Sequence, residues 1–169
     1  MIRFAYLKKQ EKERAAKQLF SILESNMTAI APTGNTFEED FAAWSAQVLP
    51  ALEKPARQIV CIYNDTDLIG FFQYYVHKSL FMMEEIQFKK EYHSRHNLFR
   101  RLYAYILSNL PSGIRTVEAY ANKKNIKSQG ILTHIGLRVV AEEERNLRYR
   151  GNFSDLAAWL YRTEENETK

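Results

Sequence analysis

The sequence is poor in cysteine and has no long apolar run. Of its 169 residues only Cys61 is a cysteine, so no disulfide can form within the chain, and a reducing cytoplasm is the simplest expectation. Cys61 lies in the apolar run IVCIY, which favours a buried hydrophobic role over a catalytic thiol. No apolar stretch reaches the roughly 20 residues that span a membrane, and residues 1–20 lack the apolar segment of a signal peptide. We expect a cytoplasmic protein with no membrane partner.

The sequence also lacks repeats and low-complexity linkers, which predicts a single domain over residues 1–162 followed by a polar, frayed tail at 163–169. Hydrophobic residues make up 46% of the chain and aromatic residues 13%, enough to build a core. Two nearby histidines, His93 and His96, have no further ligands at suitable spacing, so no metal site is expected.

The net charge is +4, and much of the excess is local. The basic cluster consists of Lys89, Lys90, Arg95, Arg100 and Arg101, with only Glu91 opposing it. Such a cluster suits a phosphate-bearing cofactor, nucleic acid or a solvated surface without a ligand. We favour the cofactor, and do not expect a nucleic-acid partner.

Periodicity and turn residues predict an α/β (α+β) chain. Thr36 and Glu39 have the spacing of a capping box, Pro50 is expected to end or kink the second helix, and Gly136 to cap the last one. The predicted strands cover residues 1–7, 58–63, 68–78, 80–90, 114–121, 137–144 and 155–161, and the predicted helices cover 8–26, 37–54, 97–110 and 125–135.

Three segments carry a resemblance to a known family. Asn125, Gly136 and Leu137 fit the pattern N-x-x-A-x-x-x-Y-x-x-x-G-F within NIKSQGILTHIGL, which resembles the fourth helix of the GNAT acyltransferase superfamily. Upstream, MEEIQFKKEYHSRHNLFRRL resembles its fourth strand, pyrophosphate loop and third helix, and YRGNFSDLAAWLY its last hairpin strand. The resemblance implies a GNAT-like fold: a central, mostly antiparallel mixed sheet of about seven strands flanked by about four helices.

The chain departs from the family pattern in two places. The family loop Q/R-x-x-G-x-G/A has no glycine here: one register places His96 and Leu98 at the glycines, and the other places Asn97 and Phe99 there. We favour the second register because asparagine tolerates unusual φ angles. At the position of the family's tyrosine general acid the chain has Leu132, which cannot protonate a thiolate.

The resemblance implies roles for particular residues. Acetyl-CoA is the expected co-substrate, and Glu85 is the expected general base. The cofactor is expected to contact the backbone of Gln87, Phe88 and Lys89, the loop residues Ser94, Arg95, His96, Asn97 and Leu98, and Asn125 at the start of the fourth helix. Residues that could line the acceptor site are Asn26, Thr28, Thr33, Asn35, Arg148, Tyr149 and Arg150.

The hypothesis is therefore an N-acetyltransferase that transfers an acetyl group to a primary amine by direct attack in a ternary complex. The acceptor can be a small-molecule amine or a protein amino group, and a homodimer stays open. The alternative is a GNAT-fold protein that binds CoA or another ligand but has lost catalysis, as the missing tyrosine and glycines would suggest. A nucleic-acid-binding domain, marked by a steep salt dependence of binding, is the third alternative.

Overall fold

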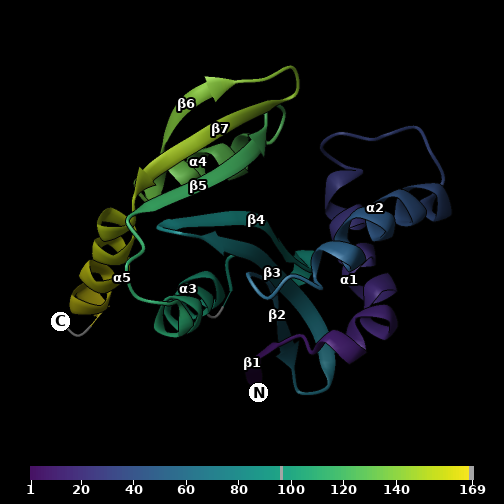
Figure 1. Cartoon of the computed structure of the whole chain (residues 1–169), viewed down its shortest axis with the longest axis horizontal. Helices are drawn as coiled ribbons and strands as arrows, with labels where there is room; N and C mark the ends of the chain where they lie inside the picture. The colour runs from purple at the N-terminus through teal and green to yellow at the C-terminus, as the bar shows by residue number, and fades with distance from the viewer. Residues whose placement is uncertain (96, 168–169) are drawn as a thin grey trace. The chain divides into compact units, whose positions relative to one another are not determined.

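The computed structural model describes residues 1–95 and 97–167 (Figure 1). The strands are β1 (Ile2–Tyr6), β2 (Arg57–Asn64), β3 (Asp67–His77), β4 (Leu80–Phe88), β5 (Thr116–Asn122), β6 (Arg138–Glu142) and β7 (Asn146–Asn152). The helices are α1 (Lys12–Met27), α2 (Phe37–Ala51), α3 (Leu98–Asn109), α4 (Ile126–His134) and α5 (Phe153–Glu167), with 3₁₀ turns η1 (Lys9–Glu11) and η2 (Lys90–Tyr92).

The seven strands form one sheet in the order β1-β2-β3-β4-β5-β7-β6. β4 and β5 pair in parallel, whereas β1 with β2, β5 with β7 and β6 with β7 pair antiparallel. The predicted mixed sheet of about seven strands is confirmed. The described chain has five α-helices, one more than the prediction of about four, because a helix follows β7.

The chain divides into two compact units. Unit 1 comprises Met1–Tyr74 and Glu85–His96, and unit 2 comprises Tyr75–Glu84 and Asn97–Lys169. The residues that the resemblance assigns to the cofactor are divided between both units.

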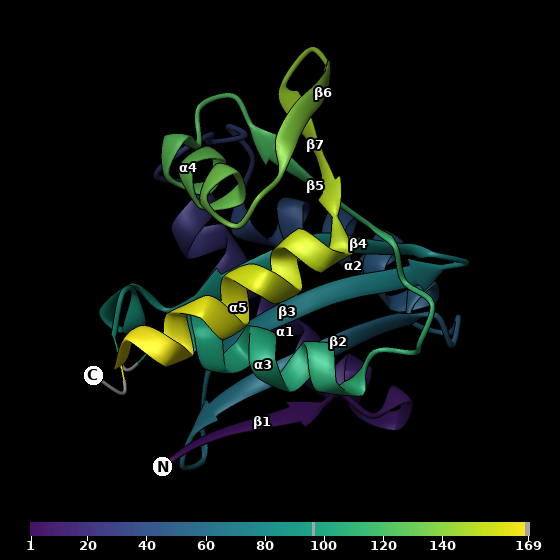
Figure 2. The same ribbon diagram turned by 90° about the vertical axis from the view of Figure 1, so that its left-hand side faces the viewer.

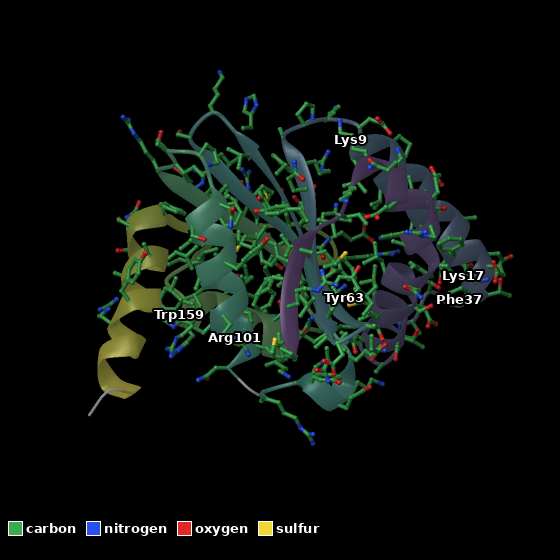
Figure 3. The ribbon with its side chains drawn as sticks, turned by 90° about the horizontal axis from the view of Figure 1, so that it is seen from below. Lys9, Lys17, Phe37, Tyr63, Arg101 and Trp159 are labelled. Carbon is green, nitrogen blue, oxygen red and sulfur yellow. The ribbon has the colours of Figure 1, made fainter. Side chains whose placement is uncertain are left out.

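Unit 1 buries its apolar residues between helices α1 and α2 and the strands. The buried members of this core are Leu19, Ile22, Leu52, Ile59, Cys61, Leu68 and Phe71. Phe20 on α1 contacts the rings of Phe37, Phe41 and Trp44 at centroid distances of 5.2, 5.6 and 5.5 Å, which holds α2 against α1. Figure 3 shows Lys17 beside Phe37, with the ammonium 5.8 Å from the ring centroid.

The start of α2 confirms the predicted capping box. The Thr36 hydroxyl accepts a bond from the Glu39 backbone N–H at 3.3 Å, and the Glu39 carboxylate accepts one from the Thr36 N–H at 2.8 Å. The helix ends one residue after Pro50, close to the predicted stop.

Unit 2 contains a correction to the predicted hairpin. Residues 155–161, predicted as the final strand, belong to α5, and the partner of β6 is β7. Leu156 and Leu160 are buried four residues apart on α5, the spacing of one helix face. Figure 2 shows α5 beside α3, where the Trp159 ring meets the rings of Phe99 and Tyr103 at 6.0 and 5.8 Å.

α5 runs to Glu167, so the predicted tail begins inside this helix; residues 168–169 lie outside the described part of the chain. Other buried residues of unit 2 are Leu102, Ile106, Val117 and Tyr149.

Candidate functional site

Backbone groups at the end of β4 contact both β3 and the side chains of neighbouring elements. The Lys89 N–H donates to the Ile69 carbonyl on β3 at 2.8 Å. The Phe88 carbonyl accepts a bond from Asn26 Nδ2 at 2.8 Å and lies 2.9 Å from His93 Nε2. Of the three residues here whose backbone was predicted to contact the cofactor, Lys89 donates its N–H to β3, and the Phe88 carbonyl accepts from the Asn26 side chain.

A chain of amide bonds positions Glu85. Asn26 Nδ2 donates to Gln87 Oε1 at 2.8 Å, and Gln87 Nε2 donates to Glu85 Oε1 at 2.6 Å. Glu85 and Gln87 are two residues apart on β4, so they share a face, while Glu84 lies on the opposite face. Gln87 is 9% exposed. A buried amide fixed by α1 therefore holds the predicted general base in one orientation.

The loop after β4 turns without glycine. Ser94 and Asn97 both have left-handed backbones, with φ of 60° and 50°. Glycine takes such φ values readily and asparagine tolerates them, whereas serine is strained there. Arg95 lies between these two turns, and His96 is outside the described residues. The loop thus takes, at two positions, the backbone conformation that glycines would make easy.

The start of α3, in unit 2, is suited to an anion. Asn97 precedes the helix in the N-cap position but does not cap it with its side chain, and the first turn contains no acidic residue. Leu98 begins the helix and is buried, and Arg100 and Arg101 follow it. The positive end of the helix dipole and the two guanidinium groups favour negative charge at this end.

Asn125 begins α4, also in unit 2. Its side-chain oxygen accepts a bond from the Ser128 N–H at 3.0 Å, so it acts as an N-cap. Leu132, at the family's tyrosine position, is 6% exposed and belongs to the core. His134 packs against the Trp159 ring at 6.3 Å. Neither residue places a proton donor at the position that the family's tyrosine would occupy.

The residues predicted to line the acceptor site make different contacts in the structure. Thr33 and Asn35 donate to Asp40 at 2.5 and 3.0 Å, and these bonds, that of Thr33 first, hold the pKa of the Asp40 carboxyl below its usual value. Thr28 donates to Glu24 at 2.9 Å. Asn26 lies within α1 and takes part in the amide chain described above.

Arg148, Tyr149 and Arg150 lie on β7, and the sequence did not predict this strand. Tyr149 is 3% exposed, on the face opposite to the two arginines. Only the arginines could therefore meet an acceptor.

The two arginines hold a buried carboxylate that the sequence did not single out. Glu118 on β5 is 1% exposed. Arg148 donates to it through Nε at 3.2 Å and through Nη2 at 2.9 and 2.8 Å, and Arg150 Nε donates at 2.7 Å. Burial raises the pKa of Glu118, but the bonds and positive charges of both arginines outweigh it, so its pKa lies below the usual value.

A groove of about 470 Å³ opens within unit 1, between α1, the turn after β2 and the end of β4. Its lining is mostly polar: Gln18, Ser21, Ile22, Ser25, Asn26, Thr66, Asp67, Leu68, Lys89, Lys90 and Glu91. Lys89 bonds both oxygens of Asp67, at 2.9 and 3.0 Å. Of the residues predicted to contact the cofactor, this lining contains Lys89.

Two kinds of feature are absent from the part of the chain that the structure describes. These residues contain no group of three or more histidine, cysteine, aspartate or glutamate side chains arranged to hold a metal ion. Nor does any helix among them have the length and apolar character needed to cross a membrane.

Comparisons with known proteins identify the fold. No protein-family model matches the chain, and no curated protein matches it in sequence. Among solved structures it is similar to an acetyltransferase from Thermus thermophilus, at 16% identity and a TM-score of 0.70, covering 90% of this chain and 97% of that one.

Two further structures are similar. One is the PaiA N-acetyltransferase of Thermoplasma acidophilum, solved with coenzyme A, at 14% identity and a TM-score of 0.68, covering 90% of this chain and 99% of that one. The other is FdhC, described as a nucleotide-linked sugar GNAT, at 14% identity and a TM-score of 0.63, covering 93% and 89%. The chain therefore has the fold of the GNAT acetyltransferase superfamily.

Proposed function

We propose that the protein is an acetyl-CoA-dependent N-acetyltransferase acting on a primary amine. The observation that carries the proposal is the end of β4, where the buried Gln87 amide donates to Glu85 at 2.6 Å and holds this carboxylate in place. The left-handed turns at Ser94 and Asn97 and the acid-free start of α3 fit a pyrophosphate. The solved neighbours of this fold support the same activity, one of them in complex with coenzyme A.

When bound, acetyl-CoA supplies an activated acetyl group as a thioester. The amine nitrogen forms the new N–C bond, the C–S bond breaks, and its electron pair leaves on sulfur. The residues of the chain orient the two reactants, polarise the thioester carbonyl and move protons. A backbone N–H at the end of β4 donates to the thioester carbonyl as negative charge develops there. Glu85 takes the proton of the attacking amine, directly or through one water.

The ends of the cofactor are held by other residues. Ser94, Arg95, His96, Asn97 and Leu98 bind the pyrophosphate, with Arg95 adding positive charge. The side-chain amide of Asn125 contacts the pantetheine arm while its oxygen caps α4. Leu132, at the position of the family's tyrosine, is buried in the core and has no proton to donate to the leaving thiolate.

The test compares two adjacent carboxylates. We expect Glu85→Gln to lower kcat for amine acetylation by about 10²-fold or more at neutral pH, with unchanged affinity for acetyl-CoA. Glu84→Gln, on the opposite face of the same strand, is the matched control and should keep kcat. The assay is release of free thiol over a panel of primary amines. Equal rates for both variants and the wild type would remove Glu85 as the base. Tight binding of acetyl-CoA with no turnover of any amine would favour a binding protein that has lost catalysis.

A further inference from the structure

The groove of unit 1 has the size of a small-molecule site and lies within one compact unit. Its volume of about 470 Å³ falls in the range of roughly 300–1,000 Å³ that is typical of ligand pockets. Its walls come from α1, the turn between β2 and β3, and the end of β4. All three segments belong to unit 1, so the groove is complete without unit 2.

The charges around the groove cancel. Lys89 and Lys90 contribute two positive charges, and Asp67 and Glu91 contribute two negative ones. Lys89 Nζ donates to both Asp67 oxygens, at 2.9 and 3.0 Å, which neutralises this pair and fixes the Asp67 carboxylate in the wall. Lys90 and Glu91 are consecutive residues of opposite sign. A lining without net charge attracts neither anions nor cations, so it favours a neutral ligand.

Neutral polar side chains supply most of the hydrogen-bonding capacity of the groove. These side chains are Gln18, Ser21, Ser25, Asn26 and Thr66. Within residues 1–95 and 97–167, the side chains of Gln18, Ser25 and Thr66 form no hydrogen bond, so all three are available to a ligand. Amides and hydroxyls both donate and accept, which lets them bond ligand hydroxyls in either direction. The lining therefore matches a ligand with several hydroxyl groups.

The groove also has an apolar floor. Ile22 and Leu68 are its two apolar lining residues and the most buried ones, at 5% and 7% exposure, and both belong to the core of unit 1. A cyclic polyol, a ring with several hydroxyl groups, has the same division, with C–H groups on its faces and hydroxyls at its edge. One C–H face on Ile22 and Leu68 removes apolar surface from water, while the hydroxyls reach the polar rim.

Asn26 connects the groove to Glu85. Its Nδ2 donates twice to β4, to Gln87 Oε1 and to the Phe88 carbonyl, each at 2.8 Å. Since the Phe88 carbonyl can only accept, it fixes the orientation of the Asn26 amide and leaves Oδ1 for a ligand hydroxyl. Gln87 Nε2 donates in turn to Glu85 Oε1 at 2.6 Å. A ligand hydroxyl on Asn26 Oδ1 would extend this chain and polarise both of its amides.

We propose that the groove is a binding site for a neutral cyclic polyol of monosaccharide size, which donates a hydrogen bond to Asn26 Oδ1. Binding strengthens the bond that Gln87 donates to Glu85, so the proposed general base senses whether the groove is occupied. The site does not depend on acetyl transfer, because its contacts involve no acetyl-CoA and no amine.

Titrations with glucose and with myo-inositol, followed by heteronuclear NMR of the full chain without acetyl-CoA, test the proposal. For at least one of them we expect saturable, millimolar-class shifts of the backbone amide signals of Ser25, Asn26 and Thr66. A Gln87 Nε2 proton should move downfield in the same titration, because its hydrogen bond strengthens. Glucosamine and glucuronate, charged rings of similar size, should bind more weakly than the neutral polyol.

Two variants locate the site. Gln18→Ala removes one hydrogen-bonding side chain of the groove and leaves the amide chain intact, so it should weaken polyol binding about fivefold. Gln47→Ala makes the same change on α2, outside the lining, and should leave the affinity unchanged. Equal affinities of these two variants would overturn the groove as the location.

The other outcomes are equally distinct. No saturable shift up to roughly 100 mM of either polyol would overturn the site. Tighter binding of glucosamine or glucuronate would overturn the neutral ligand class, and a Gln87 signal that stays in place during saturation would overturn the contact with Asn26. Polyol binding by a protein that acetylates no amine would keep the groove site and overturn the proposed function alone.

Discussion

Gly70 on β3 is the position where the structure leaves no room for a side chain. A Cβ added there would lie 2.5 Å from the Gln87 carbonyl oxygen, 2.9 Å from Phe88 Cδ1 and 3.2 Å from Ile62 Cδ1. Carbon contacts are favourable only from about 3.5 Å outward. The Phe88 and Ile62 atoms are ends of side chains and can move, but the Gln87 oxygen belongs to the backbone of β4, the strand of the proposed site.

Gly70→Ala therefore has to push β3 and β4 apart at Gln87. Overpacking of this kind costs about 1–3 kcal/mol, and replacing glycine returns about 0.5–1 kcal/mol by restricting the unfolded chain. Since a backbone atom must shift, we expect a net loss of about 2 kcal/mol in the free energy of unfolding. For a chain of this length that lowers Tm by roughly 4–8 °C. The weakened strand should also bind acetyl-CoA less tightly.

Gly130→Ala is the matched control. Gly130 lies inside α4 with no atom within 4 Å of an added Cβ, so this variant should gain about 0.5–1 kcal/mol from helix propensity. Urea unfolding followed by circular dichroism gives the free energy of both variants. A Gly70→Ala protein within about 0.5 kcal/mol of the wild type would refute the close approach of β3 and β4 at this position.

Three further predictions follow from single groups. Burial raises the pKa of Cys61 to about 11, so at pH 8 only about one thiol in a thousand is ionised. Iodoacetamide should therefore modify Cys61 only after unfolding. Rapid labelling of the native protein, detected by mass spectrometry, would contradict the burial of Cys61. The folded pKa of Glu118 is depressed, so its stabilisation is present above about pH 4.5 and is lost as the pH falls through the folded pKa. Glu118→Gln should be less stable than the wild type by about 1–2 kcal/mol at pH 7, and the difference in urea midpoint should shrink as the pH falls below about 4.5. A difference that stays constant with pH would contradict this. Thr36→Ala should cost about 1 kcal/mol in urea unfolding through loss of the α2 cap, whereas Ser45→Ala, within the same helix, should cost nothing measurable.

The sequence predicted those elements whose signals are local. The Thr36 and Glu39 spacing, the Asn125 cap and the glycine after α4 each act within a few residues, and the structure contains all of them, with Gly136 at φ of 102°. The apolar runs that became β2, β3 and β4 were also local enough to locate these strands within a few residues.

The prediction of a strand over residues 155–161 was wrong because the short apolar run there is ambiguous. Residues 155–161 alternate poorly as a strand, and Leu156, Trp159 and Leu160 are spaced three and four residues apart, which is a helical pattern. The alternation of Leu147 and Tyr149 against polar neighbours could have located β7.

The ion pairs of Glu118 with Arg148 and Arg150 could not be predicted from the sequence. Glu118 and its two arginine partners are 30 and 32 residues apart, and only the register of β5 against β7 brings them together. Similarly, the support of Glu85 by Gln87 and Asn26 depends on how α1 packs on β4, which sequence periodicity does not specify.

The central claim is that a loop without glycine binds the pyrophosphate of acetyl-CoA, and calorimetric titration with acetyl-CoA at several salt concentrations tests it most directly. We predict micromolar-class binding that weakens as the salt concentration rises. Asn97→Gly should keep this affinity. Asn97→Val should lower the affinity about tenfold or more, because valine resists the left-handed backbone at Asn97. No detectable binding by the wild type, or equal binding by all three proteins, would contradict the account.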